Sequence, residues 1–161
     1  MRIRTSADAA PVCFAVSALP ELLRERLAHV DFFAGSDPVF AGLHGFRDAS
    51  LGRSYREVAH FCYPEHVGGG NPTVVSPSPE HPVVVVHELG HALHELFRDA
   101  PIPPPVSTYA GQNAQEAFAE AFTVMVAPEA WLTSSYDGWR DVLVGCEFMR
   151  FIFDVGGVEF H

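Results

Sequence analysis

Hydrophobic residues recur at helical spacing in four parts of the chain. Residues 20–29 place their leucines on one stripe with charges opposite, which is typical of a surface helix. Residues 80–97 are apolar with histidines at helical spacing, and a Ser-Pro turn before them supplies capping groups. A third helix is expected over residues 113–126, because Asn113 is followed three residues later by an acid. A fourth helix is expected over residues 139–153.

Two further segments have the composition of neighbouring strands, Tyr55–Tyr63 and Asn71–Ser76, and a run of three glycines lies between them. The proline-rich segment 100–105 cannot remain helical, because proline lacks an amide donor and fixes φ. It is expected to be a stiff, extended connector. The order of helix, strands, helix, connector and helices predicts an α+β fold with an N-terminal mixed sheet and a helical C-terminal half.

Length and composition indicate one compact unit. A chain of 161 residues that is 48% hydrophobic can bury a core, so we expect a single domain over residues 1–161. Within that domain, residues 1–99 would supply the sheet and the histidine-bearing helix. Residues 100–161 would supply the helical half.

The chain is acidic, with 10 basic residues, 20 acidic residues and a formal charge of -10. This charge would repel phosphate backbones and anionic headgroups, so nucleic acid is not an expected partner. No stretch reaches the roughly 18 apolar residues that a membrane span needs. The apolar run 9–19 has features of a secretory signal, but Asp8 and Pro11 interrupt it. Secretion and delivery as part of a larger protein both stay open.

The candidate chemistry lies at residues 87–91, which read HELGH. Histidines four residues apart differ by only about 40° around a helix axis, so His87 and His91 can reach one metal ion. A hydrolytic Zn²⁺ site takes three protein ligands and leaves a position for water, whose proton Glu88 could accept. The composition gives roughly 0.04 accidental matches to this pattern. A metal site is therefore favoured over two structural histidines.

A third protein ligand is available further along the chain, where two glutamates stand four residues apart on one face of a predicted helix. One of them can bind the metal while the other orients a histidine ligand from behind. Glu116 could also be a capping-box acid that answers Asn113, and Glu120 could be an exposed helix charge. We expect Glu116 to be the ligand, because the site otherwise lacks a third one.

In these two blocks, HELGH and the TYAGQNAQEAFAEAF of residues 108–122, the chain resembles a known family. It is similar to the catalytic domain of anthrax lethal factor and to the secreted Pro-Pro endopeptidases of clostridia, which are zinc peptidases of the gluzincin type. The resemblance spans roughly residues 83–126. It implies a small zincin-type zinc metalloendopeptidase whose metal ligands are His87, His91 and Glu116.

The same resemblance implies roles for three further residues and for a partner. Glu88 would be the general base, and Glu120 would support a histidine ligand. Tyr109 stands seven residues before Glu116, and its hydroxyl would lie near the reacting carbonyl, unless the ring only packs beside the proline connector. The partner would be a protein or peptide substrate, which an edge strand at residues 71–76 could hold if that strand is not paired on both sides.

Two other functions remain open from the sequence. Regulatory peptidases similar to ImmA and IrrE also carry HELGH, but in that register the metal-binding acid would stand where this chain has Gln112. The second is a non-catalytic zinc module within a larger toxin or virus-encoded assembly. A structural zinc site usually closes with four protein ligands, so Glu88 beside an open position favours the enzyme. The oligomeric state is not defined by the sequence.

Overall fold

The structure is a computed structural model, and it describes residues 2–5, 10–34, 47–48, 53–54, 61–63, 73–76 and 81–158, with side chains for 10–32 and 81–158. The α-helices are α1 (Ala10–Ala18), α2 (Glu21–Arg26), α4 (Pro82–Leu96), α5 (Ala114–Val126), α6 (Trp139–Leu143) and α7 (Glu147–Gly156). Short 3-10 helices are η1 (Leu27–His29), η3 (Ala110–Gln112), η4 (Glu129–Trp131) and η5 (Ser134–Tyr136). The strands are β1 (Arg2–Thr5), β2 (Asp31–Ala34), β3 (Arg47–Asp48), β4 (Arg53–Ser54), β5 (Phe61–Tyr63) and β6 (Thr73–Ser76).

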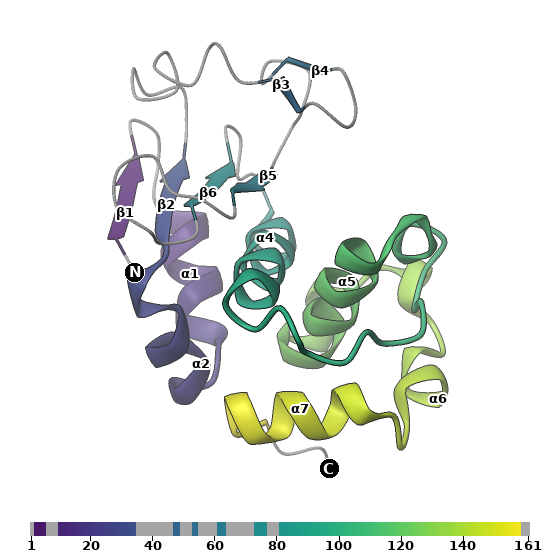
Figure 1. Cartoon of the computed structure of the whole chain (residues 1–161). Helices are drawn as coiled ribbons and strands as arrows, with labels where there is room; N and C mark the ends of the chain where they lie inside the picture. Colours follow the sequence, from purple (N-terminus) through teal and green to yellow (C-terminus); the bar gives the residue numbers. More distant parts are fainter. Residues whose placement is uncertain are drawn as a thin grey trace.

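Four of the short strands lie side by side in the order β1-β2-β6-β5 (Figure 1). β1, β2 and β6 run parallel, and β5 runs antiparallel to β6. β6 therefore pairs on both sides and is not the edge strand that could receive a substrate. Most of the predicted strand Tyr55–Tyr63 and the glycine run after it lie outside the described residues.

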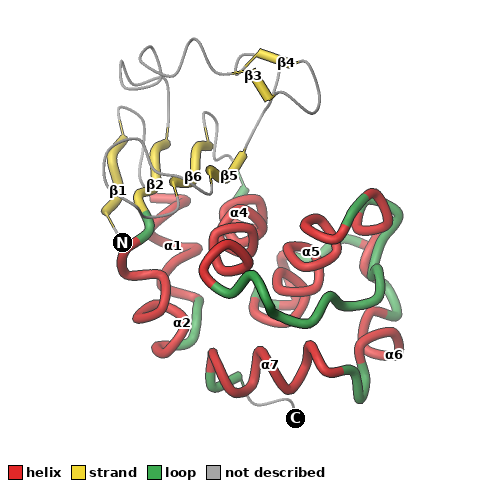
Figure 2. Tube along the Cα trace, in the orientation of Figure 1, coloured by secondary structure: helices red, strands yellow, loops and turns green. Residues whose placement is uncertain are grey.

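The predicted α+β class with an N-terminal mixed sheet is wrong for the part of the chain whose side chains are described. There, 69% of the residues are helical and 2% are in strands. The strands span only two to four residues each, and nearly all residues of the described core belong to helices or to the segments between them, with Phe32 of β2 as the strand residue among them. This part of the chain is therefore mainly helical (Figure 2). Within the described residues, no helix has both the length and the apolar character that crossing a bilayer requires.

Helix α4 is the central element of the core. It packs against α1 on one side and α5 on the other, and its N-terminal part contacts β5 and β6 (Figure 1). Leu89 and Leu93 of α4 are fully buried together with Phe118 and Phe122 of α5. Helix α7 closes the bottom of this core, where Phe148 meets Phe118 edge-to-face with ring centroids 4.9 Å apart. The candidate metal ligands lie on α4 and α5. Because these two helices form the core, their packing fixes the position of one relative to the other.

A glycine in the HELGH segment allows α4 and α5 to approach closely. A Cβ added at Gly90 would lie 2.9 Å from Ala119 Cα and 3.0 Å from Phe122 Cδ1. Real Cβ atoms essentially never come so near to a backbone atom. Only a residue without a side chain fits at this crossing.

Helix boundaries follow local capping signals. His81 caps α4, because its Nδ1 accepts from the Val83 N–H at 3.4 Å, and Pro82 at the first helical position needs no amide partner. Asn113 caps α5 in the expected way, accepting from the Glu116 N–H at 2.9 Å. The single helix predicted over residues 139–153 is wrong, because the chain breaks between α6 and α7, where Gly145 has φ of 74°.

Candidate metal centre

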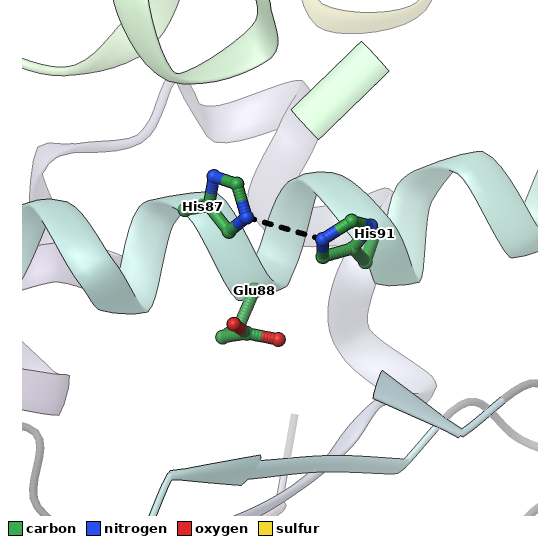
Figure 3. Close-up of side chains that lie close together, drawn as sticks. All are labelled: His87, Glu88 and His91. Carbon is green, nitrogen blue, oxygen red and sulfur yellow. Dashed lines mark hydrogen bonds between the residues drawn. The ribbon is translucent and has the colours of Figure 1, made fainter. Parts of the chain in front are cut away.

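The two histidines of the HELGH segment lie one turn apart on the face of α4 that meets α5. Their Nε2 atoms are 3.1 Å apart, and their rings meet edge-on with centroids separated by 4.8 Å (Figure 3). The helical period places both rings on one side of the helix, as the four-residue spacing predicts. Two ring nitrogens therefore point at the same small volume.

Helix α5 brings Glu116 to these nitrogens. Its Oε2 lies 3.2 Å from His87 Nε2 and 3.4 Å from His91 Nε2. The cap interaction with Asn113 uses only the backbone N–H of Glu116, so the carboxylate itself is turned to the histidines. Burial would raise the pKa of Glu116, but the contacts with the two histidines outweigh it and lower the pKa to about 2. Glu116 is therefore ionised across the physiological range.

Glu88 is a buried acid beside the pair of histidines, with 4% of its surface exposed (Figure 3). Burial raises its pKa, and the neighbouring His91 and His87 oppose that change. Its Oε2 and that of Glu116 are buried without a hydrogen-bond partner of good geometry among the described residues. The ligand atoms of His87, Glu88 and His91 lie within 4.8 Å of one another, so this group could hold a metal ion.

The other ring nitrogen of His87 faces a second glutamate of α5. His87 Nδ1 lies 3.1 Å from Glu120 Oε1, one helical turn beyond Glu116. Burial lowers the pKa of His87, but the hydrogen bonds to Glu116 and Glu120 dominate and raise it to about 9. In the metal-free chain, His87 is therefore held as an imidazolium between two carboxylates.

Tyr109 stands at the start of η3 and borders the centre. Its ring centroid is 6.0 Å from that of His87, and 49% of the residue is exposed. Burial and the nearby Glu116, Glu88 and Glu120 charges raise its pKa, so the phenol keeps its proton at neutral pH. A cavity of about 550 Å³ opens beside it, with walls that include Val83, Val84, His87 and Thr108.

The structure brings all five predicted site residues to one place: His87, Glu88, His91, Tyr109 and Glu116. His94 is not among them, because its ring stacks on Phe118 with centroids 4.5 Å apart. Sequence reasoning missed Ser107 and Tyr136, which both bond to Glu120. Neither residue stands at a spacing from Glu120 that belongs to a known motif. The general rule that a buried carboxylate needs hydrogen-bond donors was the one available signal, and it does not identify the donors.

No protein-family model matches this chain, and no curated protein matches it by sequence.

Proposed function

We propose that the chain is a zinc-dependent endopeptidase. The observation that carries the proposal is the convergence of three atoms, His87 Nε2, His91 Nε2 and Glu116 Oε2, at mutual distances of 3.1, 3.2 and 3.4 Å. Buried Glu88 lies beside them. Two imidazoles and one carboxylate form the ligand set of many hydrolytic zinc sites.

The spacing of these atoms fits a small tetrahedral ion. Ligands at about 2.0–2.1 Å from a tetrahedral Zn²⁺ lie about 3.3–3.4 Å from each other, which follows from the geometry. The three contacts are close to that value. Glu116 Oε2 has no well-aligned hydrogen bond despite two ring nitrogens within 3.4 Å. A shared cation would satisfy this buried oxygen and the facing nitrogen lone pairs together.

We assign Glu116, and not Glu88, as the acidic ligand. Glu116 Oε2 approaches both Nε2 atoms within 3.4 Å, whereas Glu88 is placed with the histidines only within a 4.8 Å group. Glu88 is then free to act as a base. Its burial favours the protonated form and so raises its affinity for a proton, which suits a group that must accept one from water.

A divalent zinc ion supplies a Lewis acid, which makes water nucleophilic near neutral pH and polarises a carbonyl. Glu88 would accept the proton released as water attacks a peptide carbonyl, and would deliver it to the leaving amine. Tyr109 carries a protonated phenol at the rim and would donate a hydrogen bond to the developing oxyanion. The cavity of about 550 Å³ next to His87 offers room for a substrate side chain.

Replacing Glu88 by glutamine tests the proposal. Glu88→Gln keeps the shape of the side chain but cannot accept a proton, so the variant should retain zinc and lose cleavage of a diverse peptide library. Glu95→Gln is the matched control, because Glu95 lies on the same helix and pairs with Arg98 at 3.2 Å. Zinc is quantified by mass spectrometry and cleavage by product profiling.

Either of two outcomes would remove the proposal. Unchanged turnover in Glu88→Gln would show that this acid is not the base. A wild-type chain that binds zinc tightly and cleaves no peptide of the library would favour a metal-stabilised module without catalysis.

A further inference from the structure

Glu120 is a buried carboxylate, only 5% exposed, whose two oxygens are held from three directions. Its Oε1 accepts from the Tyr136 hydroxyl at 2.8 Å and lies 3.1 Å from His87 Nδ1. Its Oε2 accepts from the Ser107 hydroxyl at 2.7 Å. The two hydroxyl contacts lie at the usual distance for O–H···O hydrogen bonds, and hydrogen bonds to a charged acceptor are among the stronger ones in proteins.

The two hydroxyls come from segments outside the helices that carry the centre. Ser107 follows the proline-rich connector, and Tyr136 ends the 3-10 helix η5. Ser107 Oγ also accepts from the Ala110 N–H at 3.0 Å, so its own hydrogen is directed to Glu120. The orientation of this donor is therefore fixed by the backbone turn that leads into η3.

The orientation of Glu120 determines what His87 can present to a metal. A neutral imidazole has one N–H and one lone pair, and the acceptor at one nitrogen decides which nitrogen keeps the hydrogen. When the imidazolium gives up one hydrogen to bind the ion, Glu120 Oε1 at Nδ1 would keep the other hydrogen there, and the Nε2 lone pair would face His91 and Glu116. A carboxylate free to rotate would hold this arrangement less firmly.

We propose that Ser107 and Tyr136 are positioning residues of the metal centre, which fix the Glu120 carboxylate so that His87 keeps Nδ1–H and directs Nε2 at the ion. The inference rests on the metal centre of the proposed function and not on peptide hydrolysis. Outer partners of metal ligands typically contribute 10–100-fold to metal affinity. If Ser107 and Tyr136 only satisfied the buried carboxylate of Glu120, their removal would not have to change the affinity for zinc.

The test measures zinc affinity by competition with a chromophoric chelator. Tyr136→Phe and Ser107→Ala should each weaken zinc binding by about 10-fold, whereas Ser107→Thr, which keeps a hydroxyl, should retain most of it. Ser135→Ala is the matched control, because Ser135 lies on the same turn as Tyr136 and its hydroxyl contacts Thr133 Oγ1 at 2.6 Å instead of Glu120. The control should bind zinc as the wild type does.

A double-mutant cycle separates positioning from general support of the fold. In a Glu120→Ala background, Tyr136→Phe should have no further effect on zinc affinity, because its only proposed route to the metal is removed. The ¹⁵N shifts of the zinc-loaded His87 ring should change in Tyr136→Phe and stay unchanged in Ser135→Ala. Circular dichroism confirms that each variant is folded before these comparisons.

The inference is overturned if Tyr136→Phe and Ser107→Ala bind zinc as the wild type does with unchanged His87 shifts. It is also overturned if Tyr136→Phe weakens binding equally with and without Glu120. None of these measurements depends on cleavage, so a chain that binds zinc and cuts no peptide would refute the endopeptidase and leave this inference standing. A wild-type chain without zinc affinity would refute both.

Discussion

The close crossing of α4 and α5 at Gly90 leads to a sharp prediction for Gly90→Ala. The added methyl carbon would lie 2.9 Å from Ala119 Cα and 3.2 Å from Ala119 O, which are backbone atoms that no side-chain rotation can move. Reaching an ordinary contact of 3.4 Å requires the helices to separate locally by about 0.5 Å. The distances from Glu116 to both histidines span the same gap between the helices.

Two opposing effects decide the magnitude. Alanine is favoured over glycine in a helix interior by about 1 kcal/mol. Overpacking a filled core costs about 1–3 kcal/mol, and a clash with backbone falls at the upper end of that range. The net change should be a loss of about 1–2 kcal/mol in the free energy of unfolding, with weaker zinc binding because Glu116 is displaced from the histidines.

Urea unfolding and zinc titration of the variant measure both consequences. Gly111→Ala is the matched control, because a Cβ there meets nothing within 4 Å. The control should keep wild-type zinc affinity. A Gly90→Ala chain that is as stable as the wild type and binds zinc equally well would refute the role of this contact.

Three further predictions concern the ligands and their support. Glu116→Ala should remove most zinc at stoichiometric loading, while Glu120→Ala should retain more metal, with its affinity lowered by at least the roughly 10-fold expected for Tyr136→Phe; equal metal content in wild type and Glu116→Ala would refute the ligand assignment. At pH 7 the metal-free His87, with its pKa of about 9, is protonated, so zinc binding should release about one proton from it, against roughly a quarter for an ordinary histidine. Calorimetry in buffers of different ionisation enthalpy measures that release, and affinity should fall as the pH is lowered. Asn113→Ala should cost about 1 kcal/mol of stability through loss of the α5 cap, while Gln115→Ala in the exposed first turn should cost little; equal urea midpoints for both would contradict the cap.

Local periodicity and capping explain which parts of the fold could be predicted. Helix α4 was expected over residues 80–97 and is found at Pro82–Leu96, and α5 begins after the expected cap Asn113. These features depend on neighbours within a few residues. The predicted fold class failed because it depended on how the elements assemble, and the break at Gly145 needed a left-handed residue that periodicity does not reveal.

The candidate site divides in the same way. His87 and His91 stand one helical turn apart on α4, and Glu116 and Glu120 stand one turn apart on α5. The spacing in the sequence therefore already placed each pair on one face of its helix. The contacts of Ser107 and Tyr136 with Glu120 span 13 and 16 positions and depend on loop paths. A donor brought in by a loop leaves no periodic trace in the sequence.

Both ring nitrogens of His87 are contacted from one helix, since Glu116 lies at Nε2 and Glu120 lies at Nδ1, on successive turns of α5. A displacement of α5 along or about its axis would therefore change the surroundings of both ring nitrogens. The position of α5 and the geometry of His87 are coupled, so a substitution that shifts this helix acts on the imidazole from two sides at once.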